Sequence, residues 1–206
     1  MLELIISFLI AFFFLMIAMT IHEFSHALVA YKLGDTTAKY SGRLTLNPLS
    51  HIDPMWTFII PLFLFISTGG QFIFGAAKPV PINYWALRNP KRDIIWVGLS
   101  GPLANFILAA LLSLLLRVPF ISANFKFILD NLIVINVILG VFNLIPIPPL
   151  DGSRVLMGLL PADLANRYAL IEPFGFLILI LLISLGFFRI LVLPLAIAIL
   201  RLLGVS

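Results

Sequence analysis

The chain has 206 residues, of which 62% are hydrophobic and 11% are charged. A soluble globular domain carries about 25% charged residues, so this composition excludes a soluble domain and indicates an integral membrane protein. The net charge of +4 is scattered over loops, which favours contact with lipid headgroups over nucleic acid, and the absence of cysteine excludes disulfides and thiolate metal sites.

Long apolar segments predict the membrane-spanning helices, each of which needs about 20 apolar residues. No basic n-region precedes the first apolar segment and no small-residue cleavage site follows it. We therefore expect residues 1–21 to belong to a permanent first span rather than to a signal peptide. The segments long enough to span, together with a further apolar run after them, are 4–29, 94–116, 128–147, 173–188 and 190–204.

The region between the first two spans is more irregular. Residues 37–47 are polar and β-prone with a Ser-Gly turn signal, so they predict a short hairpin at the membrane surface. Residues 56–73 are apolar but interrupted by Pro61 and by Gly69–Gly70, so this segment either crosses the membrane or re-enters it. Residues 76–92 are rich in proline and in basic residues, which indicates an irregular loop.

These features predict an all-α polytopic membrane protein. We expect about five to six membrane segments, a short interfacial β-hairpin and, as one option for residues 56–73, a re-entrant segment. No internal repeat and no linker divides the sequence, so residues 1–206 are expected to form a single membrane-embedded domain.

The first span ends in ionisable residues that membrane helices rarely carry. In the stretch HEFSH, residues 22–26, the two histidines are four residues apart, so on a helix they project from one face. Two imidazoles at this spacing can bind one Zn²⁺, and Glu23 beside them can accept a proton from water. The alternative is that His22 and His26 cap the span at the interface. Ionisable groups within a span are costly and usually functional, which favours the metal site.

A catalytic zinc site normally has three protein ligands. With no cysteine available, His51, Asp53 and the other carboxylates are candidates for the third, and Asp151 is the best placed. Prolines at 146, 148 and 149 end the preceding helix and leave an extended segment that can aim this carboxylate inward. The alternative for Asp151 is a helix N-cap at the membrane surface.

Four motifs of the chain are similar to those of one known family: HEFSH at 22–26, NPLSH at 47–51, GPLAN at 101–105 and NLIPIPPLDG at 143–152. Together they resemble the site-2 protease family of intramembrane zinc metalloproteases, peptidase family M50, over residues 15–157. The resemblance implies that His22, His26 and Asp151 hold one Zn²⁺ per chain and that Glu23 acts as general base. It also implies a catalytic core over residues 4–157, followed by C-terminal membrane segments over 173–204.

A hydrolase of this kind also needs hydrogen-bond donors for the oxyanion that forms during hydrolysis. The candidates are Asn143, in the NLIPIPPLDG motif, and His51, in the NPLSH motif. The alternative for Asn143 is a packing contact between helices, which is also the favoured interpretation of Asn105 and Asn136.

The expected function is regulated intramembrane proteolysis, the hydrolysis of peptide bonds in or near the transmembrane segment of a single-span membrane protein. The substrate is expected to bind as an unwound strand that pairs with residues 37–47. The alternatives are a transporter or channel with a metal site, against which Glu23 argues, and a non-catalytic scaffold that binds membrane helices, against which the complete set of four site residues argues. The expected partners are the substrate and the lipid bilayer, without nucleic acid. The sequence does not indicate an oligomeric state.

The positive-inside rule predicts the orientation of the spans. Lys32, Lys39 and Arg43 follow the first span and nothing basic precedes it, which predicts an outside N-terminus and a zinc site toward the cytoplasm, in a prokaryotic plasma membrane. For Asp151 to reach the histidines, the third span must run in the same direction as the first, and the second in the opposite direction. Residues 56–73 must then return to the side on which they start, or a further crossing must lie between residues 74 and 92. The polar, proline-rich composition of residues 74–92 favours re-entrance of residues 56–73.

Overall fold

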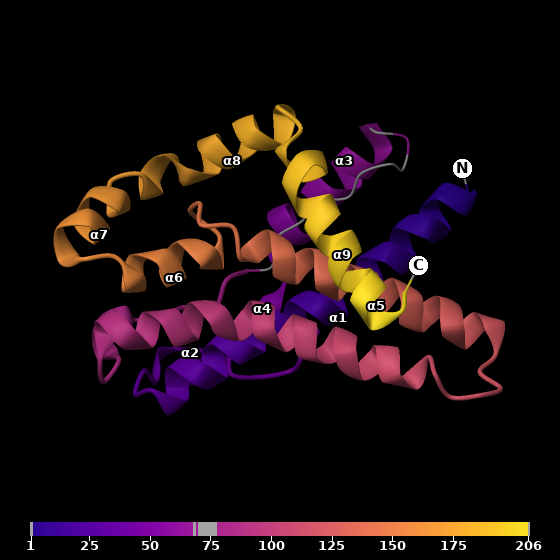
Figure 1. The fold of residues 1–206 in the computed structure, drawn as a ribbon, viewed down its shortest axis with the longest axis horizontal. Coiled ribbons are helices and arrows are strands. Elements are labelled where there is room, and N and C mark those ends of the chain that lie inside the picture. Colours follow the sequence, from indigo (N-terminus) through magenta and orange to yellow (C-terminus); the bar gives the residue numbers. More distant parts are fainter. Residues whose placement is uncertain (1, 68, 70–77, 206) are drawn as a thin grey trace.

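The structure is a computed structural model that describes residues 2–67, 69 and 78–205. All regular elements in these residues are helical, so the expected all-α class is confirmed. The α-helices, drawn in Figure 1, are α1 (Leu2–Lys32), α2 (Thr37–Tyr40), α3 (Ile60–Ser67), α4 (Pro90–Leu115), α5 (Ala123–Asn143), α6 (Asp151–Leu159), α7 (Ala162–Ala169), α8 (Gly175–Ser184) and α9 (Leu193–Leu203). Short 3₁₀ or π-helical segments are η1 (Pro48–His51), η2 (Pro54–Ile59), η3 (Tyr84–Ala86), η4 (Glu172–Phe174) and η5 (Phe188–Val192).

Four helices of the described chain are long and apolar enough to cross a membrane. They are Ile5–Lys32 in α1, Pro90–Leu115 in α4, Ala123–Asn143 in α5, and Ala162–Ser184, which combines α7, η4 and α8. η5 and α9 form a continuous helical run over residues 188–203, and these 16 residues are fewer than the about 20 that a span needs. The structure therefore supports an integral membrane protein with four candidate spans, and the expected count of five to six membrane segments is not confirmed.

The helices α1, α4 and α5 form the centre of the molecule (Figure 1). α4 packs against both α1 and α5, and α6 packs along α4. In Figure 1, α1 and α5 run toward the same side of the view, whereas α4 runs the opposite way. These are the relative directions that the sequence analysis required for Asp151 to reach the histidines of α1.

Glycines allow close contact between these helices. A Cβ atom on Gly140 of α5 would lie 2.7 Å from the ring of Phe106 on α4, and one on Gly98 of α4 would lie 3.0 Å from the backbone oxygen of Asp151. Small residues at such contacts let membrane helices approach closely and gain van der Waals packing. The first residue of α6 is thereby held against α4.

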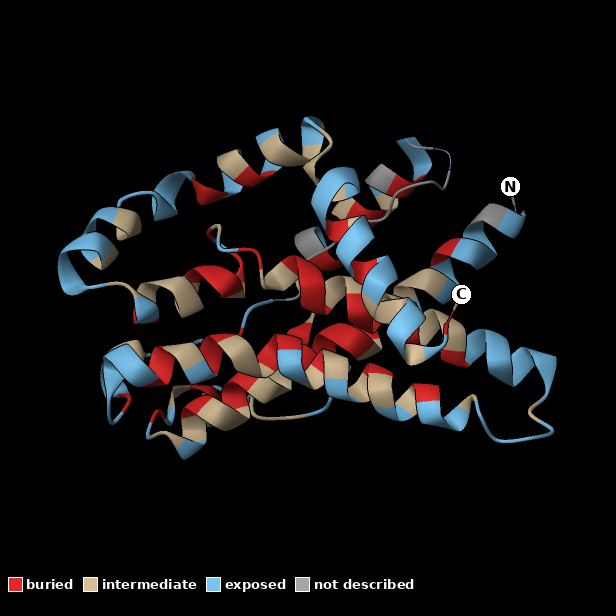
Figure 2. Cartoon of the chain, in the orientation of Figure 1, coloured by how far each residue is buried: buried red, intermediate tan, exposed pale blue. Residues whose placement is uncertain are grey.

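Buried residues, red in Figure 2, gather where α1, α4, α5 and the start of α6 meet. The outward faces of the helices carry large apolar side chains instead. Such faces are unfavourable in water but suit the acyl chains of a bilayer. Examples are Phe13 on α1, Ile107 and Leu111 on α4, Leu177 on α8 and Leu202 on α9.

The β-hairpin expected at residues 37–47 is not formed. The described backbone there contains the short helix α2 and no strand. The carboxylate Oδ1 of Asp35 accepts hydrogen bonds from the N–H of Thr37 (2.9 Å) and from its hydroxyl (2.5 Å), and a side-chain acceptor at this position favours a helical turn over a strand. Gly42 follows with φ +68°, the left-handed conformation that commonly ends a helix. The Ser-Gly signal therefore marks the end of a helical turn.

The segment 56–73, for which the sequence favoured re-entrance, lies partly outside the described residues. Its described part belongs to η2 and α3, and the apolar helix Thr57–Ser67 is shorter than a span. Gly69 follows with φ +62°, and its N–H donates to the backbone oxygen of Ile66 (3.2 Å). The described helix therefore ends at Ser67, before the first glycine of the pair, while residues 70–77 lie outside the described residues and the return of the chain stays a prediction.

Candidate metal centre

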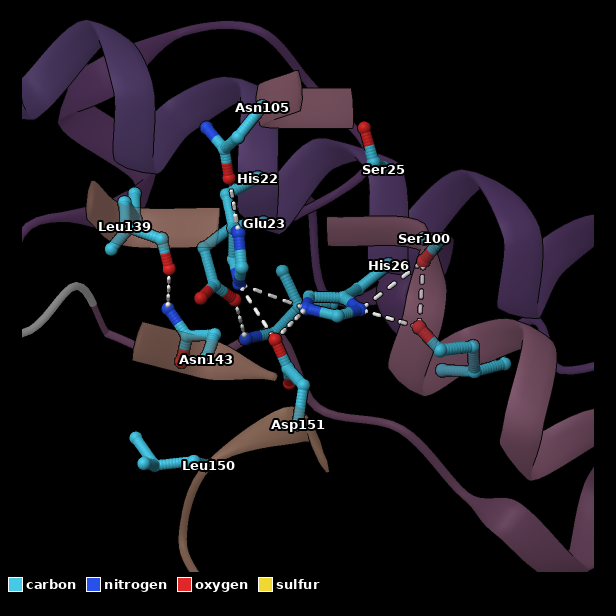
Figure 3. Close-up of polar contacts among 12 residues, drawn as sticks. His22, Glu23, Ser25, His26, Ser100, Asn105, Leu139, Asn143, Leu150 and Asp151 are labelled. Atoms are coloured by element: carbon cyan, nitrogen blue, oxygen red, sulfur yellow. Dashed lines mark hydrogen bonds and ion pairs between the residues drawn. The ribbon is translucent and has the colours of Figure 1, made fainter. Parts of the chain in front are cut away.

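His22 and His26 lie one turn apart on α1 and point toward Asp151 of α6 (Figure 3). The two Nε2 atoms are 3.1 Å apart, and Oδ2 of Asp151 lies 2.9 Å from the Nε2 of His22 and 3.1 Å from that of His26. Both imidazoles are buried and the carboxylate is partly buried. The three side chains form a group that could hold a metal ion, and they are the three that the sequence analysis selected.

The spacing of the three atoms is close to that of zinc ligands. Bonds from zinc to histidine nitrogen and carboxylate oxygen are about 2.0–2.2 Å, so ligand atoms at the corners of a tetrahedron lie about 3.3–3.6 Å apart. The separations in the structure, 2.9 to 3.1 Å, are slightly shorter. A small outward shift of the side chains would therefore admit the ion, and the chemistry of the donor set matches zinc.

A sharp turn between α5 and α6 brings Asp151 to the histidines. The proline-rich residues 146–149 interrupt the helical run, and Gly152 packs directly on the backbone, where a Cβ would lie 2.2 Å from the oxygen of Leu144. Asp151 is the first residue of α6, and the helix has no side-chain cap at Leu150. The carboxylate of Asp151 thus contacts the imidazoles. It does not cap the helix, as the alternative interpretation expected.

The surroundings of Asp151 keep its carboxylate ionised. Burial raises the pKa of this group, but the adjacent imidazoles of His26 and His22 lower it by more, so that the pKa of Asp151 lies well below its usual range.

Glu23 lies on the wall of the same cavity as the two histidines (Figure 3). Its Oε2 accepts a 2.8 Å hydrogen bond from the N–H of Val80. Val80 lies between Pro79 and Pro81, which have no N–H. Within residues 79–81, Val80 therefore has the one backbone N–H that can donate. The loop that the sequence predicted to be irregular thus contributes to the site by orienting a carboxylate.

α4 approaches the histidines most closely at Gly101, in the GPLAN motif. A Cβ atom there would lie 2.4 Å from the Nε2 of His26 and 2.6 Å from the Cε1 of His22. Any side chain at this position would collide with the imidazoles. In the sequence, the GPLAN motif contributed only to the family resemblance, and the structure supplies the steric reason for its glycine.

α4 also provides partners for the second ring nitrogen of each histidine. The Nδ1 of His22 lies 2.6 Å from Oδ1 of Asn105, and the Nδ1 of His26 lies 2.7 Å from the backbone oxygen of Val97 and 3.2 Å from Oγ of Ser100. Metal-binding histidines commonly use their other nitrogen in this way. Asn105 was expected to serve helix packing, and its contact with His22 was not predicted. Its place one turn after Gly101, which puts both residues on one face of α4, could have indicated the contact.

Asn143 and His51, the candidates for oxyanion stabilisation, lie in different surroundings. Asn143 lines the cavity, and its Nδ2 donates a 3.0 Å hydrogen bond to the backbone oxygen of Leu139. His51 is fully buried in η1 with its Nε2 3.0 Å from the backbone oxygen of Thr45, and it is not among the described residues that line the cavity. Asp53 lines the cavity but does not belong to the described metal group. The structure therefore brings Asn143, and not His51, to the site.

The metal group forms part of the wall of a cavity of about 810 Å³. Three helices give the cavity an apolar lining, namely Leu15 and Met19 of α1, Ile138 and Phe142 of α5, and Leu179 and Ile183 of α8. An apolar cavity with a few convergent polar groups is the usual form of a substrate site. The space is therefore a candidate binding site for an apolar ligand.

Arg154, one turn after Asp151 on α6, lies on another part of the cavity wall. Both terminal nitrogens of its guanidinium pair with the carboxylate of Glu172 in η4, and the guanidinium carbon is 5.4 Å from the ring centre of Tyr84 in η3. Burial raises the pKa of Tyr84 although the charge of Arg154 opposes this shift, so the phenol stays protonated. Arg154 thus connects three elements around the cavity, a role that the sequence analysis did not assign.

A helical membrane domain that joins an H-E-x-x-H helix to a remote aspartate has the features of a membrane zinc metalloprotease. Comparison with known proteins leads to the same class. The profile of peptidase family M50 matches residues 117–183, which include Asp151. With the relatives described next, this match shows that the chain belongs to peptidase family M50, the family of the site-2 proteases.

Three curated relatives illustrate the similarity. YwhC of Bacillus subtilis is 38% identical over 177 residues, which cover 82% of this chain and 77% of YwhC. Rip2 of Mycolicibacterium smegmatis is 35% identical over 170 residues, with 82% and 64% covered, and MJ0392 of Methanocaldococcus jannaschii is 38% identical over 71 residues, with 34% and 21% covered. The names of all three include the words zinc metalloprotease, whereas no solved structure matches the chain significantly. The chain is therefore a zinc metalloprotease of the membrane.

Proposed function

We propose that this metalloprotease hydrolyses peptide bonds in or near the transmembrane segments of single-span membrane proteins. The position of the metal group carries the proposal. The group lies on the wall of a cavity whose apolar lining comes from the helices α1, α5 and α8. Placing ionisable groups inside a bilayer is costly, and a protease for soluble peptides would gain nothing from that cost.

His22, His26 and Asp151 are the proposed ligands of one zinc ion per chain. Zinc bound in a protein lowers the pKa of water to about 7 and polarises a carbonyl group. Glu23, beside the ligands, is the proposed general base, which takes a proton from the attacking water and returns it to the leaving amine. The hydrogen bond from Val80 holds one oxygen of this carboxylate at the cavity wall.

Asn143 is the proposed donor to the oxyanion. Its amide has two N–H groups, of which one bonds to Leu139, and the side chain lines the cavity. The second N–H is therefore the group that this residue would direct to a developing negative charge. His51 is the less supported candidate, because its ring bonds to Thr45 and does not line the cavity.

The helix at 37–40 removes the strand edge that the sequence analysis assigned to substrate binding. A different backbone segment lies on the cavity wall, residues 78–82, which are non-helical and contribute Lys78, Val80 and Ile82 to the lining. The N–H of Lys78 donates to the backbone oxygen of His51 (2.8 Å), which anchors one end of the segment. An unwound substrate is proposed to lie along this segment at the cavity wall.

The proposed orientation places the zinc site toward the cytoplasm of a prokaryotic cell, with the N-terminus outside. The basic residues around the ends of the spans support it, because loops with an excess of Lys and Arg stay in the cytoplasm. Those at the end of α1 or after it are Lys32, Lys39 and Arg43, and those before or at the start of α4 are Arg88, Lys91 and Arg92.

Co-expression with a panel of single-span membrane proteins tests the function. Each substrate is expressed with the wild type and with Glu23→Gln, and its cleavage is followed by immunoblot. The glutamine can still accept the N–H of Val80 but cannot act as a base. We expect cleavage to fall by about 10²–10⁴-fold in the variant while zinc content is unchanged. Equal cleavage by both proteins would contradict the proposal. The variant also tests the alternatives, because neither a transporter nor a scaffold needs Glu23 for its activity.

A further inference from the structure

We propose that Asn105 and Asn136 position His22 for metal binding by selecting its tautomer. The proposal rests on the zinc site of the proposed function but concerns two residues outside the ligand set. Asn105 on α4 and Asn136 on α5 are both fully buried, and His22 on α1 is 5% exposed. A chain of hydrogen bonds through these three side chains joins the three central helices, and Figure 3 shows its last step, from Asn105 to His22.

This series of hydrogen bonds begins at a backbone oxygen, which can only accept a hydrogen bond. Nδ2 of Asn136 donates a 2.8 Å hydrogen bond to the backbone oxygen of Leu132, and this bond fixes which end of the amide is the donor. The carbonyl Oδ1 of Asn136 therefore faces Asn105. It accepts a 2.7 Å hydrogen bond from Nδ2 of Asn105.

Asn105 uses both N–H groups of its amide in the same way. One donates to Oδ1 of Asn136, and the other donates to the backbone oxygen of Ala18 on α1 (3.1 Å). Reversing the amide would place its oxygen against these two acceptors. The oxygen Oδ1 of Asn105 is therefore left to face the imidazole of His22, at 2.6 Å from Nδ1.

This arrangement determines where the proton of His22 lies. Because Oδ1 of Asn105 is an acceptor, the Nδ1 of His22 must carry the hydrogen, and the Nε2 then presents its lone pair. Nε2 is the atom that faces His26 and Asp151. All three side chains are buried, so water cannot replace the missing partner if one of the asparagines is lost.

His26 provides an internal comparison. Its Nδ1 lies 2.7 Å from the backbone oxygen of Val97, which is again an acceptor only, so its tautomer is set by the main chain. Substitution of a side chain therefore changes the tautomer control of His22 and leaves that of His26 in place. The effect on zinc binding is expected to come from one ligand alone.

The test measures zinc affinity of the purified full-length protein by competition with a chromophoric chelator. Asn105→Leu removes the acceptor with little change in size, and Asn136→Leu removes the residue that orients Asn105. Asn105→Asp keeps an acceptor for Nδ1 but loses the two N–H donors to Ala18 and Asn136. Asn131→Leu is the control. Like Asn136, Asn131 donates to a backbone oxygen on α5, that of Phe127, but it does not belong to the series of hydrogen bonds through Asn136, Asn105 and His22, here called the relay.

We expect Asn105→Leu to weaken zinc binding by about 10–100-fold, as the loss of a group that orients a metal ligand typically does. Asn136→Leu should weaken it by less, Asn105→Asp should bind zinc more tightly than Asn105→Leu, and Asn131→Leu should match the wild type. Wild-type affinity in Asn105→Leu would overturn the relay while leaving the proposed function intact. A wild type that binds no zinc would overturn the proposed function, and the relay with it.

A spectroscopic signature separates a positioning role from a purely structural one. In the zinc-loaded protein, the Nδ1 proton of His22 should give a downfield resonance that moves upfield in Asn136→Leu, while the corresponding resonance of His26 stays. The chain has three histidines, so assignment by single substitution is feasible. Equal shifts of both resonances, or no shift of either, would overturn the proposal even if Asn105→Leu failed to fold.

Discussion

The backbone N–H of Asn83 donates a 2.8 Å hydrogen bond to Oδ2 of Asp35. Asp35 follows α1 and Asn83 precedes α4, and a second bond, from the N–H of Arg88 to the backbone oxygen of Leu33 (3.0 Å), joins the same two loops. Both loops must therefore lie on one side of the membrane. The chain between them makes no net crossing, which supports a returning path for the segment 56–73.

This relationship gives a prediction about labelling. In the cysteine-free chain, Lys39→Cys and Asn83→Cys should both be protected from an impermeant thiol reagent in intact cells, because both positions face the cytoplasm in the proposed orientation. Phe120→Cys is the control, since this exposed residue lies in the turn between α4 and α5 and should label. Labelling of position 83 without labelling of position 39 would show that the segment between them crosses the membrane.

Val80→Pro should reduce proteolysis without removing zinc. The substitution deletes the N–H that bonds to Glu23 and preserves the non-helical backbone of the stretch. A hydrogen bond to a charged group contributes about 1.5–3 kcal/mol, so kcat is expected to fall by about tenfold or more. Val80→Ala, which keeps the N–H, is the matched control. Similar kcat values for the two variants would show that this hydrogen bond does not position Glu23.

Gly101→Ala should abolish or strongly weaken zinc binding. The added Cβ would lie 2.4 Å from the Nε2 of His26, so that α4 must move away from α1 or the imidazoles must turn. Overpacking of this kind costs about 1–3 kcal/mol. Zinc content measured by mass spectrometry is compared with that of Leu103→Ala, a change at an exposed position of the same helix. Full zinc content in Gly101→Ala would contradict the packing described here.

Removal of a proposed ligand should release the metal. We expect purified His26→Ala and Asp151→Ala to lose the zinc of the wild type, because two remaining ligands cannot hold a site that normally needs three. His51→Ala is the control, and should keep its zinc because His51 does not belong to the metal group. If zinc content followed His51 rather than His26, the assignment of the ligands would be wrong.

Arg154→Ala should destabilise the protein more than Glu172→Ala. Glu172 is exposed, so loss of its ion pair costs about 0–1 kcal/mol. Arg154 also packs over the ring of Tyr84, and the loss of this contact adds about 0.5–1 kcal/mol. Thermal unfolding in detergent, with the exposed Arg167→Ala as control, measures the difference. The reverse order of Tm values would contradict the role given to Arg154.

Sequence patterns of short range predicted the parts of the site that a single helix creates. His22 and His26 lie on one face because a helix repeats every 3.6 residues, whatever surrounds it. The apolar segments likewise predicted the main spans, since their length is set by the bilayer. Asp151 was predicted from the prolines before it and from the family motif, and the structure brings it to the histidines.

The expected hairpin shows where local patterns were insufficient. The polar, β-prone composition of residues 37–47 predicted strands, but the buried carboxylate of Asp35 bonds to Thr37 on one side and to Asn83 on the other. The second of these bonds joins loops that are far apart in the sequence. A helical turn is therefore selected by a tertiary contact that composition does not contain.

By itself the sequence determined the membrane class, the H-E-x-x-H helix and the motifs of the family, because each depends on neighbouring residues or on total composition. Tertiary structure alone decided that Asn105 meets His22, 83 residues away, that Gly101 makes room for the imidazoles, and that Val80 bonds to Glu23, 57 residues away. These contacts depend on the packing of α4 on α1 and on the path of a loop. Many pairings of polar residues are compatible with the same apolar pattern, and only the packed helices select one.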